Sequence, residues 1–307
     1  MTTKNNEKEN IVSVNTPEVC PTNEQDKRCA PSAKFDAGSC IELSVFIEMA
    51  KAYNKTASES SKITLYDNMD SLNPRKYKKY LVREFNKRMG DKCTTQKCWS
   101  EQDFISNMKK TARDELERYT FRPNGPDGKF EWLNTINIME VMDQYEKSNT
   151  AFKFLGAVPI DFDKFERMGI KNLDYNDLMK NNKHKLGVIF NLDEHDQPGS
   201  HWVALFSDLK KGQVYFFDSN GRRPVERIRK LMRRIVTFIQ TGTGNKNIVA
   251  DYNKIQHQYE NSECGVYSIN FITRMLNGED FETICNSKVP DKKINKCRNE
   301  YFANANV

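Results

Sequence analysis

Residues 258–272 read QYENSECGVYSINFI, a polar loop that runs directly into an apolar segment. The apolar residues beyond the loop, from Val266 to Met275, recur at helical spacing. Cys264 and Gly265 stand at the junction, where a helix N-terminus offers free amides and partial positive charge. These groups favour a thiolate over a thiol, and glycine allows a close backbone approach. The segment therefore predicts a core helix that begins at a reactive cysteine.

Upstream of this helix the chain has short apolar runs that are typical of strands. Two of them, 201–209 and 213–219, are joined by the short turn KKG, as in a hairpin. The expected elements are a helix over 132–148, a turn and short helix over 157–165, strands over 185–193, 201–209, 213–219 and 247–256, and helices over 221–240 and 264–278. This order predicts an α+β fold, with a small central mixed sheet flanked by helices.

The first 122 residues have a different character. Residues 1–36 are rich in Lys, Asn, Glu, Thr and Pro, so they are interpreted as a disordered tail. Helical spacing over 38–54, 74–90 and 100–121 predicts a helical N-terminal domain over 37–122. Prolines and glycines in 122–132 then mark a boundary, and 123–307 is the expected catalytic core domain.

The bulk properties indicate a soluble, intracellular protein. The chain of 307 residues is 37% hydrophobic and 29% charged, and it shows neither a membrane-spanning run nor a signal peptide. Its eight cysteines are therefore expected to be free thiols. Cys93 and Cys98 are the closest pair, but a second pair to complete a zinc site is not nearby. No metal or cofactor is expected.

Four residues together suggest cysteine-dependent acyl transfer. Cys264 is the candidate nucleophile, and His201 at a strand start is the candidate base and acid. Asp218 ends the next strand, where an acid would orient the imidazole. Gln258 could donate its side-chain amide to the oxyanion beside the Cys264 amide. Taken singly, such a cysteine is more often a buried hydrophobe and such a histidine more often structural.

Neighbouring residues leave some alternatives open. His257 adjoins Gln258, but alternation along an extended chain lets only one of the two readily face Cys264, and Gln258 is favoured. Gln256 is the alternative oxyanion donor, on the same face as Gln258. His184 and His195 lie in polar loops and are expected to be exposed.

The motifs HW at His201, FFDS at Asp218 and Q-x5-CG at Gln258 resemble those of the adenain and ubiquitin-like-protein-protease clan of cysteine peptidases. That clan has the order His, Asp/Asn/Glu, Gln, Cys, and WLNTINI at Trp132 is similar to its substrate-groove segment. The sequence around the cysteine is most similar to the polyprotein-processing proteases of large DNA viruses, of the African swine fever virus type. Asp218 stands where that enzyme carries Asn, and Asp is common elsewhere in the clan.

The resemblance implies a thiol endopeptidase that cleaves viral structural or core polyproteins, after Gly-Gly-like sites, during virion maturation. Trp202, Trp132 and Gly265 are the implied substrate-binding residues. The implied location is the virion and the host-cell cytoplasm. One alternative is an isopeptidase that removes ubiquitin-like modifiers from host proteins. A second is a non-catalytic virion or nucleic-acid-binding protein on the same fold.

The helix expected over 221–240 is strongly basic. Its apolar positions hold helical spacing, so one face packs and the other is solvated. A solvated charged face is the simpler interpretation, and a weak contact with nucleic acid is the sharper one. The residues that could make this contact are Arg222, Arg223, Arg227, Lys230 and Arg234.

Overall fold

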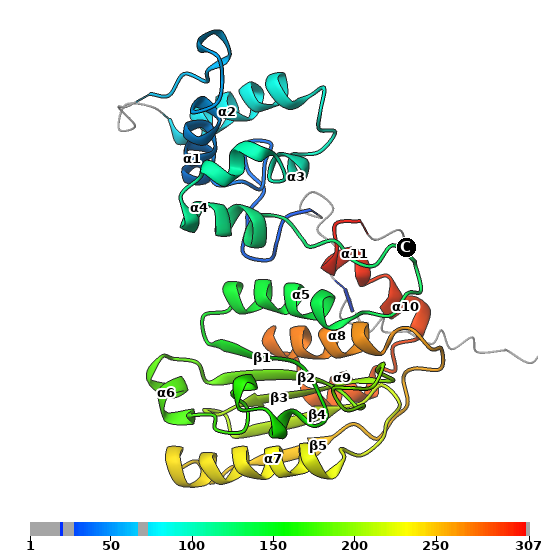
Figure 1. The fold of residues 1–307 in the computed structure, drawn as a ribbon. Helices are drawn as coiled ribbons and strands as arrows, with labels where there is room; N and C mark the ends of the chain where they lie inside the picture. The colour runs from blue at the N-terminus through cyan, green and yellow to red at the C-terminus, as the bar shows by residue number, and fades with distance from the viewer. Residues whose placement is uncertain (1–18, 21–27, 67–72, 305–307) are drawn as a thin grey trace, which may run out of the picture.

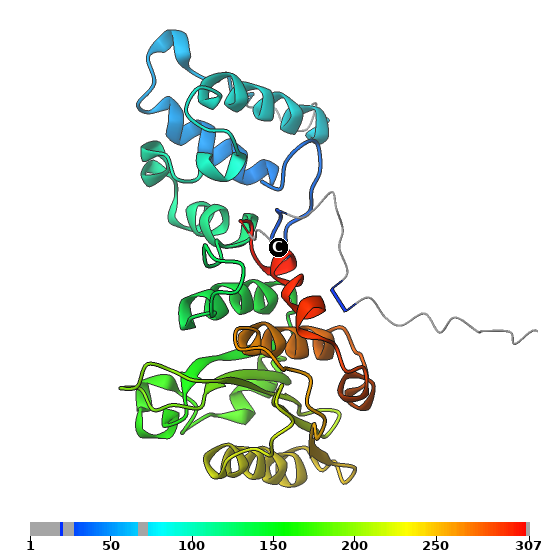
Figure 2. The same cartoon turned by 90° about the vertical axis from the view of Figure 1, so that its right-hand side faces the viewer.

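The structure is a computed structural model that describes residues 19–20, 28–66 and 73–304. A helical N-terminal region stands at one end of the molecule, and a sheet covered by helices stands at the other (Figures 1 and 2). One hydrophobic cluster is built between Cys29 and Phe121. Two more clusters lie on the two faces of the sheet. Apart from Val19, their buried residues all come from Leu133 onward. We propose a domain boundary near residue 123.

The described residues form a five-stranded mixed sheet in the order β1-β2-β3-β4-β5. The β2–β3 and β3–β4 pairs are antiparallel, whereas β1–β2 and β4–β5 are parallel. The strands are β1 (Phe152–Pro159), β2 (Lys185–Asn191), β3 (Trp202–Asp208), β4 (Gln213–Phe217) and β5 (Val249–Tyr252). The α+β class and the mixed sheet are confirmed.

The sequence pattern did not predict strand β1. The expected turn over 157–165 is wrong at its start, because Ala157, Val158 and Pro159 belong to this strand. Gly156 has a φ of 119°, and the register with β2 shifts between Phe154 and Ala157. This bulge interrupts the alternation that identifies a strand from sequence.

Helices cover both faces of the sheet (Figure 1). One face carries α5 (Thr135–Ser148) and α8 (Cys264–Leu276), and the other carries α7 (Glu226–Phe238). Strand β3 alternates between the two clusters, with Trp202, Ala204 and Phe206 on the α8 side and Val203 and Leu205 on the α7 side. Every residue of α8 is buried, so the helix that starts at Cys264 is a central core element.

The N-terminal region contains more and shorter helices than expected. Its α-helices are α1 (Leu43–Asn54), α2 (Pro74–Met89), α3 (Gln96–Trp99) and α4 (Lys110–Asp114). The single helix expected over 100–121 is wrong. Met108 is extended, with φ −71° and ψ 155°, and it separates a 3-10 turn over Asp103–Asn107 from α4. Residues Glu115–Thr120 then continue as a wider helical turn.

Six of the eight cysteines form disulfides, which corrects the expectation of free thiols. The pairs are Cys20–Cys297, Cys29–Cys40 and Cys93–Cys98, and Cys264 and Cys285 are free. The expected tail also needs correction within the described residues. Cys29 pairs with Phe121 in a β-bridge, and Cys29 and Ala30 are buried. Residues 1–18 and 21–27 of that tail lie outside the described residues.

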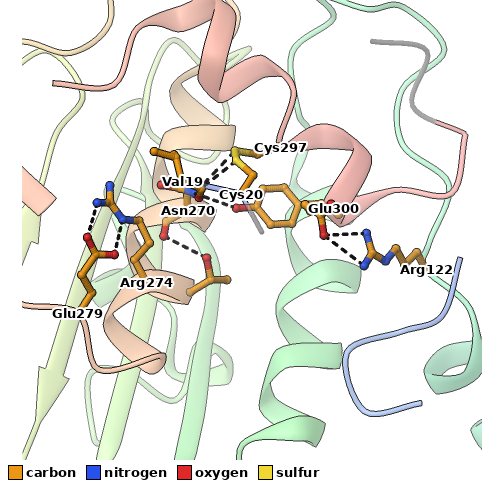
Figure 3. Close-up of a disulfide and its surroundings, with 10 residues drawn as sticks. Val19, Cys20, Arg122, Asn270, Arg274, Glu279, Cys297 and Glu300 are labelled. Carbon is orange, nitrogen blue, oxygen red and sulfur yellow. Dashed lines mark hydrogen bonds and ion pairs between the residues drawn. A yellow bond between two sulfur atoms is a disulfide. The ribbon is translucent and has the colours of Figure 1, made fainter. Parts of the chain in front are cut away.

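Beyond α8 the described residues form three short helices that the sequence pattern did not predict: α9 (Phe281–Asn286), α10 (Asp291–Asn295) and α11 (Arg298–Tyr301). Figure 3 shows how this end is attached to distant segments. Cys297 is bonded to Cys20, and Glu300 forms an ion pair of 3.4 Å with Arg122. The remaining α-helix among the described residues of the sheet region is α6 (Tyr175–Lys180). None of the helices in the described ranges has the length and apolar character of a membrane span.

Candidate active site

His201 and Asp218 meet at one edge of the sheet because β3 and β4 are antiparallel. Ala204 pairs with Phe217, so the chain just before β3 and the chain just after β4 lie at the same end of these strands. The Nε2 of His201 lies 2.6 Å from Oδ1 of Asp218. This leaves Nδ1 as the ring nitrogen that can face a third group. The hairpin thus creates an oriented imidazole from two strand ends.

Backbone and side-chain hydrogen bonds fix Asp218 in place. Its side chain is buried, and its Oδ1 also accepts a 2.8 Å hydrogen bond from the backbone N–H of Asn220. Asn253 bonds the Asp218 backbone twice: its Oδ1 accepts from the N–H and its Nδ2 donates to the C=O, each at 2.8 Å. Asn253 follows β5, so the parallel β4–β5 pair brings it to the same edge. The carboxylate therefore has little freedom to leave His201.

Cys264 is the first residue of α8 and is buried. Its thiol is one of the groups that raise the pKa of His201, so the thiol and the imidazole lie close together. Burial acts to lower the pKa of His201, but the interactions with Asp218 and Cys264 outweigh it and raise that pKa to about 9. The protonated imidazole is therefore the favoured form at neutral pH. A charged imidazole next to a cysteine at a helix start favours a thiolate.

Gln258 lies next to this group and is buried. Its Oε1 accepts a 2.6 Å hydrogen bond from Ser219 Oγ, and its backbone N–H bonds Ser219 O at 3.0 Å. Its Nε2 donates to Glu260 O at 2.7 Å. An amide nitrogen carries two hydrogens, so it can make a second donation.

A short segment, residues 131–133, lies across the start of α8. Trp202 Nε1 donates a 2.8 Å hydrogen bond to Leu133 O. A Cβ on Gly265 would lie 3.0 Å from Leu133 Cβ, so glycine permits this close approach. Trp132 is 44% exposed, whereas Trp202 is buried in the core. Of these two tryptophans, Trp132 is the one exposed to solvent, and it directly precedes Leu133, which lies close to Gly265.

The other histidines lie elsewhere. His257 is buried, its Nε2 is 3.0 Å from Cys285 O, and burial lowers its pKa. His195 is exposed, as expected, and contacts Asp161 at 2.8 Å. The expectation of exposure is wrong for His184, which is partly buried and lies 3.1 Å from Asp208 Oδ1.

Gln256, the alternative oxyanion donor, bonds a neighbouring residue. Its Nε2 donates to the backbone oxygen of Gln258 at 2.8 Å. Gln256 therefore supports Gln258, the residue that was favoured over it as the oxyanion donor.

The basic helix α7 is partly neutralised by acidic neighbours. Arg227 is paired with Glu194 and Asp163, and Arg229 and Arg233 are paired with Glu226. Arg234 bonds the Ile170 carbonyl. Arg222, Arg223 and Lys230 are exposed, and they are the residues of this set most open to a partner.

Sequence reasoning did not identify several residues that hold this site, above all Ser219, Asn253, Glu263 and Arg298. Ser219 directly follows Asp218, and Glu263 directly precedes Cys264, so adjacency was an available signal. Asn253 and Arg298 reach the site through the fold alone. Their contributions could not be read from local pattern.

The family model described as the Ulp1 protease family, C-terminal catalytic domain, matches residues 171–305. A protein of Acanthamoeba polyphaga mimivirus, named as a thiol protease, is 39% identical over 283 residues, which is 90% of this chain and 93% of that protein. The chain belongs to the Ulp1 protease family. It is a cysteine protease.

Other relatives of this Ulp1-family protein agree with that assignment. The cysteine protease of African swine fever virus is 24% identical over 264 residues, covering 80% of this chain and 96% of the relative. The crystal structure of an African swine fever virus protease has a TM-score of 0.59 at 21% identity, covering 77% of this chain and 93% of that one. This last likeness is one of fold. The family resemblance expected from the sequence is confirmed.

Proposed function

We propose that this protease is an endopeptidase in which Cys264 is the nucleophile and His201 the base and acid. The observation that carries the proposal is the 2.6 Å bond between His201 and Asp218, with Cys264, at the start of α8, close enough to raise the pKa of the same imidazole. Asp218 orients the ring and stabilises its charged form. Gln258 and the Cys264 backbone N–H bind the oxyanion.

In the first half-reaction the Cys264 thiolate attacks the scissile carbonyl carbon, and a C–S bond forms. The carbonyl electron pair moves to oxygen, where the Gln258 amide and the Cys264 amide stabilise the charge. When the oxyanion collapses, the C–N bond breaks and the His201 imidazolium gives its proton to the leaving amine. The product is an acyl-thioester and a neutral imidazole.

In the second half-reaction the neutral His201 takes a proton from water, and the resulting hydroxide attacks the thioester carbon. The C–S bond breaks, which releases a carboxylic acid and restores the thiolate beside a protonated imidazole. Asp218 keeps the same hydrogen bond through both halves. The raised pKa of His201 suits a group that must be charged in the resting enzyme.

For substrates we propose viral structural or core polyproteins, cut after Gly-Gly-like sites during virion maturation in the host-cell cytoplasm. Support comes from two viral relatives that are named as proteases and that the chain matches over 93% and 96% of their length. Gly265 adjoins the nucleophile, and Trp132 precedes the residue that approaches Gly265, so the two would favour a small residue before the scissile bond. Trp202 would act by holding the Leu133 backbone, since its indole is buried.

An isopeptidase acting on ubiquitin-like modifiers is the second candidate. It is favoured by a relative from African swine fever virus, 23% identical over 264 residues, that is named a SUMO-1 cysteine protease. A weak nucleic-acid contact through Arg222, Arg223 and Lys230, with Arg227 and Arg234 nearby, is a further proposal. Because ion pairs neutralise part of the positive charge of α7, this contact ranks below the two protease functions as a proposal.

The test is digestion of candidate capsid and core proteins, with mapping of the new termini. Wild type and Cys285→Ala, which replaces the other free cysteine, should produce the same termini. Cys264→Ala should produce none. Cleavage of modifier conjugates without cleavage of any structural protein would favour the isopeptidase. Equal cleavage by Cys264→Ala would reject the assignment of the nucleophile.

A further inference from the structure

Two residues of the C-terminal helices connect the same pair of distant segments. Asn295 Nδ2 donates to Lys129 O at 3.1 Å and to Glu263 Oε1 at 2.9 Å. Arg298 Nη2 donates to Glu131 O at 2.7 Å and to Ser262 O at 3.3 Å. Each side chain therefore bridges residues 129–131 and residues 262–263. We call Asn295 and Arg298 the C-terminal clamp.

Both bridged segments end at the candidate site. The first leads into Trp132 and the second leads into Cys264. Glu263 stiffens the second segment, since its carboxylate accepts hydrogen bonds from the Ser262 N–H at 3.1 Å and the Ser262 hydroxyl at 2.6 Å. The clamp thus connects the residues that precede Trp132 to the residues that precede Cys264.

The same segments line a pocket of about 740 Å³. Its walls include Phe130, Trp132, Ser262, Glu263 and Asn295. Phe130 is 62% exposed, so the pocket presents two large aromatic side chains close to the nucleophile loop. The rest of the wall is largely charged, with lysine and carboxylate side chains, so the pocket combines exposed aromatic surface with charged groups.

The clamp residues are buried in a way that stability alone does not favour. Arg298 is 3% exposed and Asn295 is 2% exposed. Each keeps one buried polar atom without a hydrogen-bond partner among the described residues, Arg298 Nε and Asn295 Oδ1. A buried unpaired polar atom costs free energy, and such groups are retained most often where they serve function.

We propose that Arg298, assisted by Asn295, is a positioning residue that holds the Trp132 segment against the nucleophile loop and thereby sets which substrate residue fits before the scissile bond. This rests on the proposed endopeptidase function. Arg298 reaches two carbonyl oxygens from one planar guanidinium. A lysine ammonium lacks that rigid geometry, so it can replace the bridge only in part.

The test compares Arg298→Met, Arg298→Lys and Asn295→Ala with wild type. Two peptides are used that differ only in the residue before the mapped cleavage site, one carrying the preferred small residue and one a larger residue. Misplacement of the groove by about 1 Å is expected to lower kcat/KM about 100-fold in Arg298→Met. The ratio of kcat/KM between the two peptides should fall about 10-fold, because a loosened groove excludes large residues poorly. Arg298→Lys should lie between Arg298→Met and wild type.

Arg274→Met is the matched control. Arg274 is also a buried arginine, 7% exposed, but it pairs with Glu279 near the opposite end of α8 from Cys264. A ratio measured within one sample does not depend on how much of the protein is folded. Arg274→Met should therefore keep the wild-type ratio even if it is less stable. A wild-type ratio in Arg298→Met, or an equal fall in Arg274→Met, would overturn the proposal.

Amide hydrogen exchange tests the clamp without a measurement of cleavage. In Arg298→Met, amides of residues 129–133 and 262–264 should exchange faster than in wild type, whereas Arg274→Met should leave them unchanged. Faster exchange combined with an inactive wild type would contradict the proposed function but still support the clamp. Unchanged exchange in both segments would reject the clamp itself.

Discussion

The hydroxyl of Ser219 donates a 2.6 Å hydrogen bond to Oε1 of Gln258, and both residues are buried. Because the oxygen end of the amide accepts from Ser219, the NH2 end must point elsewhere. Ser219 directly follows Asp218, which holds His201. One dipeptide after β4 therefore orients both the imidazole and the side-chain amide proposed for the oxyanion hole.

Replacement of Ser219 by Ala should lower kcat with little change in KM. Loss of one oxyanion donor costs about 100- to 1,000-fold in kcat, so loss of its orientation should cost about 10-fold. The measurement is steady-state cleavage of a peptide containing the mapped site. Ser207→Ala is the matched control, since Ser207 is a fully buried serine on β3 whose hydroxyl has no partner among the described residues.

A double-mutant cycle separates orientation of the amide from general support. In a Gln258→Ala background, Ser219→Ala should have little further effect, because the group that it orients is gone. If the fold-losses in kcat of the two single variants multiply in the double variant, Ser219 acts independently of Gln258.

The two free cysteines should differ sharply in reactivity. Cys264 lies close to the His201 imidazole at the start of α8, the surroundings in which reactive cysteines are found. Burial raises the pKa of Cys285 to about 12, so its thiolate is scarce at neutral pH. Brief treatment with iodoacetamide at pH 7 should label Cys264 and leave Cys285 unmodified, as read by peptide mass spectrometry. Cys285→Ala should be labelled like wild type, and equal labelling of both thiols in wild type would contradict this account.

The pair of His201 and Asp218 should stabilise the fold over a defined pH range. The folded-state pKa of His201 is about 9, above its ordinary value of 6.5. The resulting stabilisation is fully present below pH 6.5 and disappears as the pH rises through 9. Asp218→Asn removes the anionic partner, so it should lower the free energy of unfolding near pH 6.5 and do so less above pH 9.

Urea unfolding at several pH values between 6 and 10 measures this difference. The gap in unfolding free energy between wild type and Asp218→Asn should narrow as the pH rises. A gap that stays constant across this range would show that Asp218 stabilises the fold by other means.

The sequence was most informative where local pattern and chemistry coincide. The strands ending near His201 and Asp218 are short apolar runs with a tight turn between them, so their antiparallel pairing could be predicted. Cys264 stands at a visible change from polar loop to apolar helix. The bulge at Gly156 hid β1, because it breaks the alternation.

Long-range pairing could not be predicted from spacing. Arg298 contacts Glu131 and Ser262, which lie 167 and 36 residues away, so only the fold shows its surroundings. The disulfides illustrate the same limit. Cys20 and Cys297 are separated by 277 residues, and nothing local to either one marks the other as its partner.

Counting thiols tests the cysteine pairing directly. The structure contains three disulfides and two free cysteines, Cys264 and Cys285. Protein purified without reductant and unfolded in urea should therefore react with two equivalents of a thiol reagent, because unfolding exposes buried thiols but leaves disulfides intact. After reduction the same protein should react with eight equivalents, the full cysteine content. Cys264→Ala lowers each count by one and serves as the control for stoichiometry. Eight reactive thiols before reduction would instead restore the free-thiol interpretation drawn from the sequence.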